Sequence, residues 1–179
     1  MTERFVRPYT PADLEDVRTI CFETGYMGEP IAWQFDDRTA FCELFCDWHV
    51  LHHPDTAWVV DDGGHAVGYL IGCPDVRGRF AREADWPVDL DRFPADLHIN
   101  LLPAARGQRF GRALVTTWFE RLVELGGPGV HLGTWGENAG AISFFRSVGF
   151  IESGERSPNL FRLRDGELAT VAHFTRPVL

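Results

Sequence analysis

The chain has 179 residues, enough for a globular fold with a sizeable apolar core, and we expect a single domain over residues 1–179. Its 26 acidic and 17 basic residues give a net charge of −9, which argues against nucleic acid or an anionic membrane as the main partner. We expect no membrane span, because no stretch reaches roughly 18 apolar residues, and no signal peptide at the polar start. The four cysteines show no disulfide spacing, so we expect a cytoplasmic protein with reduced thiols.

The N-terminal part predicts a strand, a helix and a loop in that order. The apolar pair at residues 5–6 suggests the strand. Thr10 is typical of a helix N-cap, a proline follows it, and Asp13 completes the pattern of a capping box. Gly25 is the expected end of this helix, and residues 26–33 contain a glycine and a proline and are expected to form a loop.

A second helix is predicted from Asp36 or Asp37 to the residues before Pro54, since a residue that precedes proline disfavours the helical conformation. Its apolar stripe consists of Phe41, Leu44, Phe45, Trp48 and Leu51.

The same helix carries cysteines and histidines that invite a metal hypothesis. One straight helix aims two such groups at an ion, rarely the four of a tetrahedral site, and no second ligand cluster is evident. We therefore expect no metal site and interpret these residues as buried cysteines and solvated histidines. They are Cys42, Cys46, His49, His52 and His53.

Two apolar runs, 58–60 and 66–72, flank a glycine turn and predict a β-hairpin. The connection that follows, 74–94, is long for a compact domain. It is either a surface excursion held by its aromatic side chains or a wall or lid over a substrate. The residues behind these alternatives are Arg77, Arg79, Arg82, Phe80, Trp86 and Phe93.

The chain is organised around residues 97–125, where a strand pattern changes to a helix pattern. Leu97, Ile99 and Leu101 alternate with His98 and Asn100, which gives the period of a strand. The following apolar positions have helical spacing, and a glycine stands where that helix should end. These positions are Phe110, Leu114, Val115, Trp118, Leu122 and Leu125, with Gly126 as the stop.

A small-residue turn with three arginines, 106–112, lies between that strand and that helix. The unpaired amides and the positive dipole end of a helix start favour an anion, and glycine lets the backbone come close to it. The spacing is neither a dinucleotide-binding fingerprint nor a P-loop.

The C-terminal part predicts a strand at 130–135, a helix that opens at Glu137-Asn138 and closes at Gly149, and a strand from Phe150. A last strand at 168–174 is expected to run antiparallel to it. Residues 154–166 are polar and rich in turn formers.

Two motifs resemble those of the GCN5-related N-acetyltransferase (GNAT) family. The turn from Arg106 to Gly111 resembles its Arg/Gln-x-x-Gly-x-Gly/Ala pyrophosphate motif, and residues 138–150 resemble its second signature. The resemblance implies an α/β fold with a mixed, mostly antiparallel central sheet of about six to seven strands and about four helices. Within the family, residues 72–76 and 93–100 look most like the acetyltransferase-like domain of O-GlcNAcase and its bacterial relatives.

The resemblance also implies acetyl-CoA as cofactor and assigns its contacts. The pyrophosphate would lie on the backbone of the turn, and the pantetheine arm would lie along the end of the strand. A backbone amide at the end of the strand could also donate to the thioester oxyanion. The loop at 26–33 would border the acceptor site. The implied contacts are Leu101, Leu102, Arg106, Gly107, Gln108, Arg109, Phe110, Gly111, Arg112, Asn138 and Phe145.

Acetylation of an amine needs a base, because an alkyl ammonium with a pKa of ~10.4 must lose a proton. His98 and Asn100 share the polar face of the strand, and a neutral imidazole accepts a proton near pH 7. The alternative for His98 is a structural role. Asp75 is the second candidate, either as the base or to orient the ammonium.

Two departures from the family pattern leave an alternative function open. Arg109 stands at a glycine position, and Phe145 stands where a tyrosine often protonates the leaving thiolate. We expect an N-acetyltransferase that transfers acetyl directly to a primary amine, with a binding module of low or no activity as the alternative. A relay through Cys73 also stays open. The acceptor amine is unknown, and a homodimer is possible.

Overall fold

The computed structural model describes residues 3–77, 79 and 87–178, and its internal contacts divide the chain into two compact units. The first unit comprises residues 1–73 and 98–121, and the second comprises 74–97 and 122–179. Strand β4 (Ala95–Leu101) contributes its first residues to the second unit and its last to the first. None of the described helices is both long and apolar enough to cross a membrane.

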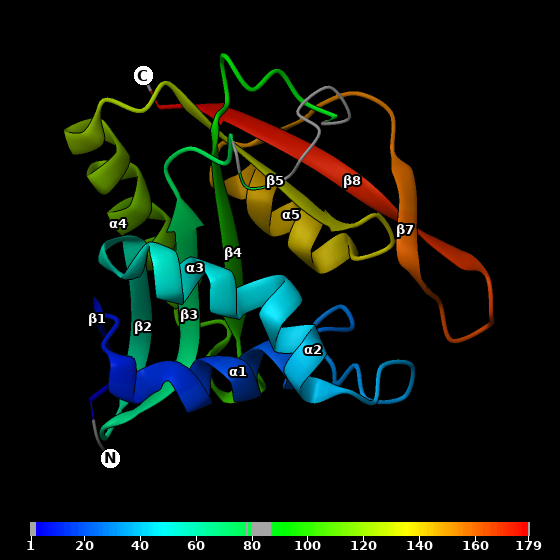
Figure 1. The fold of residues 1–179 in the computed structure, drawn as a ribbon, viewed down its shortest axis with the longest axis horizontal. Helices are drawn as coiled ribbons and strands as arrows, with labels where there is room; N and C mark the ends of the chain where they lie inside the picture. The colour runs from blue at the N-terminus through cyan, green and yellow to red at the C-terminus, as the bar shows by residue number, and fades with distance from the viewer. Residues whose placement is uncertain (1–2, 78, 80–86, 179) are drawn as a thin grey trace. The chain divides into compact units, whose positions relative to one another are not determined.

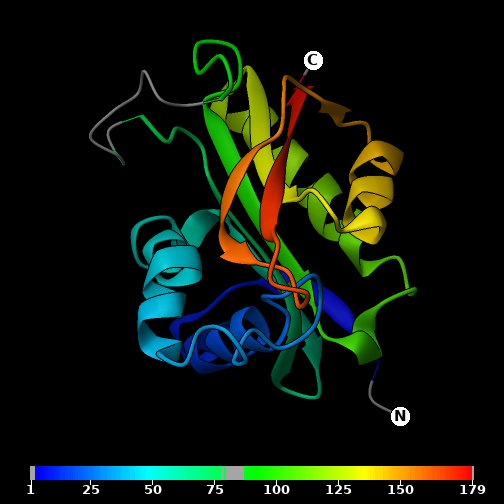
Figure 2. The ribbon, with the colours of Figure 1, turned by 90° about the vertical axis from the view of Figure 1, so that its right-hand side faces the viewer.

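The first unit holds a sheet with the order β1-β2-β3-β4. Strands β1 (Phe5–Pro8), β2 (Ala57–Asp62) and β3 (His65–Cys73) pair antiparallel, which confirms the predicted hairpin. Figures 1 and 2 show α1 (Leu14–Glu23) on one face of these strands and α4 (Phe110–Leu125) on the other. The α4 face carries Trp58, whose ring centroid lies 6.1 Å from that of Trp118 in α4.

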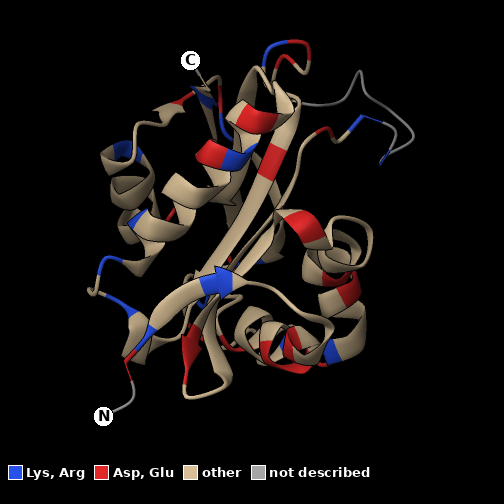
Figure 3. Cartoon of the chain, turned by 90° about the vertical axis from the view of Figure 1, so that its left-hand side faces the viewer, with Lys and Arg blue, Asp and Glu red and all other residues tan. Residues whose placement is uncertain are grey.

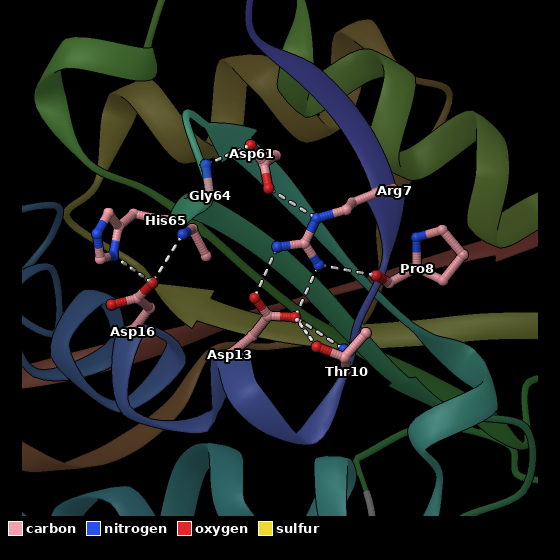
Figure 4. A network of polar contacts seen from close by, with 9 residues as sticks. Arg7, Pro8, Thr10, Asp13, Asp16, Asp61, Gly64 and His65 are labelled. Carbon is pink, nitrogen blue, oxygen red and sulfur yellow. Dashed lines mark hydrogen bonds and ion pairs between the residues drawn. The ribbon is translucent and has the colours of Figure 1, made fainter.

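The start of α1 is held by an ionic network that Figure 4 shows. The Thr10 N–H donates to the Asp13 carboxylate over 2.8 Å, as a capping box requires. Arg7 of β1 donates to both oxygens of Asp13, over 2.8 and 2.7 Å, and to Asp61 of β2 over 2.7 Å. Asp61 also accepts from the Gly64 N–H of the hairpin turn. One guanidinium therefore joins a strand, a helix start and a hairpin turn.

The predicted second helix is one helical segment interrupted by a π-helical turn. It consists of α2 (Arg38–Cys42), the turn Glu43–Asp47, and α3 (Trp48–His52), and the Asp37 side chain caps it by accepting from Ala40 N–H. A π turn adds a residue and shifts the side chains that follow it around the helix axis.

This shift makes part of the predicted apolar stripe wrong. Leu44 and Leu51 are 44% and 64% exposed, whereas Cys46, Asp47 and Val50 are buried. The cysteines are buried as expected, but His49 is buried too, so its predicted solvation was wrong. Among the described residues, no group of three or more His, Cys, Asp or Glu could hold a metal ion.

The second unit holds a sheet with the order β4-β5-β8-β6, and β7 pairs with β8. The β4–β5 pair is parallel, with Ala95 opposite Val130, and β8 runs antiparallel to β5, β6 and β7. Helix α5 covers the face of Phe174, whose ring lies 6.0 Å from that of Phe145. The bounds are β5 Gly129–Trp135, α5 Ala139–Ser147, β6 Ile151–Glu152, β7 Ser157–Arg162 and β8 Leu168–Pro177.

The predicted fold class is confirmed, with eight strands in the described residues instead of six or seven. The unpredicted strand β7 lies within 154–166, where Pro158 and Asn159 obscure its alternation of half-buried and exposed residues.

The long connection at 74–94 is described only in part. Its Val76 N–H donates to the carbonyl of Pro94 over 2.9 Å. Phe80, Arg82 and Trp86 lie outside the described residues, so a lid there stays a prediction.

Candidate active site

The turn between β4 and α4 has the backbone geometry of an anion site. Gly107 has φ +73° and Arg109 has φ +66°. The Arg109 carbonyl accepts the Ala113 N–H over 3.0 Å and so makes the first hydrogen bond of α4. The N–H groups of the first helical turn precede that bond and have no partner within a helix. A Cβ built at Gly107 would meet nothing within 4 Å, so the turn is open on that side.

The polar side chains of this turn divide into two groups. Arg106 donates to Leu101 O over 2.9 Å and to Gly28 O over 2.7 Å, and Gln108 donates to Ala104 O over 2.7 Å. These two side chains therefore hold the turn in shape. The Arg109 and Arg112 side chains are exposed.

The acidic side chains that give the chain its negative net charge are spread over α1, α4 and several loops, as Figure 3 shows.

Arg109→Gly should raise the free energy of unfolding by up to about 1 kcal/mol. A non-glycine residue in the left-handed region costs roughly 1–2 kcal/mol, which glycine relieves, whereas the greater freedom of glycine in the unfolded chain takes back about 0.4–1 kcal/mol. Urea unfolding measures the difference. Ala113→Gly, a right-handed position in the first turn of α4, is the control and should lose about 1 kcal/mol. Equal losses in the two variants would contradict the argument.

The polar face predicted for β4 is present and has an unpredicted third member. His98 Nδ1 lies 3.1 Å from the hydroxyl of Tyr69, and the Asn100 side-chain amide donates to the same hydroxyl over 3.0 Å. His98 and Asn100 are half-buried, and Tyr69 of β3 is fully buried. The ring of Phe45 lies 6.3 Å from that of His98. One signal in the sequence indicated that Tyr69 belongs to this polar face, namely a polar hydroxyl group within an otherwise apolar strand.

Asp75, the second candidate base, lies in the second unit and is bound by a neighbour. Arg77 Nε donates to its two carboxylate oxygens over 2.9 and 3.0 Å, and Nη2 donates over 2.6 Å. The guanidinium holds the pKa of Asp75 below its ordinary value. A carboxylate stabilised in this way is a weaker base than a free one.

The end of β4 offers fewer free backbone groups than the sequence suggested. Leu102 N–H donates to Val67 O over 2.9 Å, and Leu102 O accepts the Ala105 N–H. The Leu101 carbonyl accepts from Arg106. The amide of Leu102 is therefore engaged and is not an open donor for an oxyanion.

The predicted residues of α5 have clear local roles. Asn138 is the N-cap, and its Oδ1 accepts the Ala141 N–H over 3.0 Å. Phe145 is buried, with its ring centroid 5.3 Å from Phe144 and 5.9 Å from Phe150. A phenylalanine fits this apolar site, and it has no proton to give.

Residues 14–150 match the model of the acetyltransferase (GNAT) family. The chain belongs to the GNAT family. Its structure is similar to the crystal structure of SsHAT, with a TM-score of 0.79 and 28% identity over 99% of both chains. It also shares its fold with the phosphinothricin acetyltransferase of Sinorhizobium meliloti solved with AcCoA, at a TM-score of 0.71 and 22% identity, covering 99% of this chain and 89% of that one. The fold is also shared with the structure of yncA from Salmonella typhimurium, solved with its cofactor acetyl-CoA. That comparison has a TM-score of 0.69 and 18% identity, and it covers 99% of this chain and 95% of that one.

Membership of the GNAT family makes this chain an acetyltransferase with acetyl-CoA as cofactor. The turn at 106–112 fits that cofactor, because its open backbone and helix start suit a pyrophosphate. Arg109, which stands at a glycine position of the motif, has φ +66°, in the left-handed region that favours glycine.

Proposed function

We propose that this GNAT chain transfers the acetyl group of acetyl-CoA directly to a primary amine of a small molecule or a protein. The observation that carries the proposal is the open turn at 106–112, which ends in the first hydrogen bond of α4. When bound, acetyl-CoA supplies the acyl group on a thiolate leaving group. The rest of the chemistry falls to the chain's own side chains and backbone.

The backbone amides from Gly107 to Arg112 would hold the pyrophosphate, and the exposed Arg109 and Arg112 would add positive potential. Arg106 and Gln108 would support this binding through the shape of the turn. The family resemblance adds Leu101 and Leu102 as pantetheine contacts. It adds Asn138 and Phe145 as cofactor contacts in the second unit.

His98 would take the proton of the acceptor ammonium. An imidazole is neutral near pH 7 and accepts a proton there, whereas the Arg77 guanidinium weakens Asp75 as a base. Asp75 would instead attract and orient the ammonium. Because the phenylalanine at Phe145 has no proton to give, the thiolate would take its proton from water or leave as an anion. Asn100 would keep its place beside His98 through the Tyr69 hydroxyl.

Four finer features belong to the same proposal. The resemblance of residues 72–76 and 93–100 points to the acetyltransferase-like domain of O-GlcNAcase. The absence of a disulfide spacing favours a cytoplasmic location, and the net charge of −9 favours a cationic acceptor. A homodimer stays a prediction.

The test is a calorimetric titration with acetyl-CoA, followed by an acetylation assay on polyamines, aminoglycosides and lysine peptides. We expect micromolar binding, and a loss of about tenfold or more in Arg112→Glu, which replaces a cation beside the helix start by an anion. Arg121→Glu makes the same charge change farther along α4 and should keep the parent's affinity. No binding by the parent would refute the proposal. Binding without acetylation of any amine would favour the binding module instead.

A further inference from the structure

The side chain of Arg106 joins two backbone segments of the first unit that are far apart in the chain. Its Nε donates to Leu101 O at the end of β4 over 2.9 Å, and its Nη2 donates to Gly28 O over 2.7 Å. The Arg106 N–H donates to Pro103 O over 3.2 Å, so the backbone that carries this side chain is itself held. One guanidinium therefore joins the end of the strand to the loop at 26–33.

The segment of the loop beside Arg106 is a tight turn that needs a glycine. Tyr26 and Glu29 exchange two backbone hydrogen bonds of 2.8 Å. Met27 and Gly28 between them have φ +51° and +92°, the sign that a type I′ turn requires at both central positions. A Cβ built at Gly28 would lie 3.2 Å from Nη1 and from Nη2 of Arg106. The guanidinium therefore lies against a position that only a glycine leaves open.

The other end of the loop is held by α1. Ile31 is fully buried, and its N–H donates to Phe22 O of α1 over 3.2 Å. Trp33 is 41% exposed, and its ring meets the buried ring of Tyr26 edge to face, with 5.0 Å between the centroids. The turn at 26–29, with the aromatic contact that it makes, is thus the part of the loop whose place depends on Arg106.

We propose that Arg106 is a positioning residue for the acceptor, which holds the turn at 26–29 beside the pantetheine arm, where the amine approaches the thioester. This inference rests on the proposed function, in which that arm lies along Leu101 and Leu102. Because Arg106 bonds the carbonyls of Leu101 and Gly28 at once, the turn lies at the end of the strand that the arm would follow. Glu29, the next residue, is exposed and has the charge that attracts an ammonium.

Gly28→Ala is the direct test, because its Cβ displaces the guanidinium from the loop and leaves Arg106 itself unchanged. Gly64→Ala is the matched control. Gly64 has φ +94° in the same unit, and a Cβ there would meet nothing within 4 Å, so both variants carry the same backbone strain and only one disturbs Arg106.

We expect the KM for the amine to rise by roughly tenfold in Gly28→Ala, with kcat at saturating amine and the affinity for acetyl-CoA close to those of the parent. Gly64→Ala should match the parent in all three quantities. An amine KM in Gly28→Ala equal to that of Gly64→Ala would overturn the inference. A loss of acetyl-CoA affinity as large as the rise in amine KM would also overturn it, since the contact would then serve the cofactor.

A second variant changes the other partner of the contact. Arg106→Lys keeps the positive charge and replaces the planar fork by one ammonium group. We expect the amine KM to rise here too, and to rise no further when Gly28→Ala is added, because both changes break the same contact. Additive effects of the two changes on the amine KM would contradict the proposal.

Amide hydrogen exchange tests the hold of Arg106 on the loop without any activity. The amides of Tyr26 and Glu29 should exchange faster in Arg106→Lys than in the parent, while that of Ile31 keeps its rate because α1 holds it. Unchanged exchange at Tyr26 and Glu29 would exclude the hold. A parent that acetylates no amine would refute the proposed function and with it the role toward the acceptor, and the exchange rates would still decide whether Arg106 positions the turn.

Discussion

His98→Ala should lower kcat for acetyl transfer by about 10²–10⁴-fold and leave the affinity for acetyl-CoA close to that of the parent. The reason is that an amine attacks a thioester only as the neutral base, and the imidazole is the group proposed to remove its proton. His98 is half-buried beside Tyr69 and Asn100, which fixes the ring in place. Steady-state kinetics with saturating acetyl-CoA and one reactive amine measure kcat, and calorimetry measures the affinity.

His65→Ala is the matched control for this prediction. His65 belongs to the same unit, on β3, and its side chain is 81% exposed, 3.5 Å from Asp16. Its removal should leave kcat unchanged. A rate in His98→Ala equal to that of His65→Ala would exclude the imidazole as the base. A large loss in Asp75→Asn alone would then assign the base to Asp75.

Asp13→Ala should lower the free energy of unfolding by about 3 kcal/mol, because it leaves a partly buried guanidinium without its bidentate partner. The Asp13 side chain is 4% exposed and that of Arg7 is 24% exposed. The change also removes the acceptor of the Thr10 N–H at the start of α1. For a chain of this size we expect the melting temperature to fall by about 6–12 °C. Urea unfolding and calorimetry measure the two quantities.

Glu15→Ala is the control, since Glu15 lies on the same helix and pairs with Arg38 at the surface, where its side chain is 68% exposed. Its loss should cost no more than about 1 kcal/mol. An equal loss in the free energy of unfolding in Asp13→Ala and Glu15→Ala would show that the network of Arg7 stabilises the fold no more than a surface ion pair does.

The same network gives a pH dependence whose sign is fixed. Arg7 is the main cause that lowers the pKa of Asp13, and the Gly64 N–H and Arg7 lower that of Asp61. A depressed pKa means stabilisation that is complete above the unfolded value of about 3.9 and is lost as the pH falls through the folded values. The stability difference between the parent and Asp13→Ala should therefore be constant near pH 6 and shrink below about pH 4. A difference that grows on acidification would contradict the assignment.

The sequence by itself determined the elements whose signals are local. Helix α4 runs from Phe110 to Leu125 as predicted, because its apolar spacing is regular and Gly126 ends it with φ +71°. The capping box at Thr10 and the cap at Asn138 were equally readable, since each involves residues three apart. The turn before α4 and the family motifs belong to the same class of short-range pattern.

Only the tertiary structure decided the features that depend on distant segments. The π turn at Glu43–Asp47 rotates the later part of its helix, and no local sequence pattern predicted this turn. Tyr69 reaches His98 because β3 and β4 are neighbours in the sheet, 29 positions apart in the chain. Arg106 donates to the carbonyl of Gly28, which is 78 positions away in the chain. Caps and apolar periods act within a few residues of the chain, whereas strand neighbours and the partners of long side chains are chosen by the packing of the whole unit.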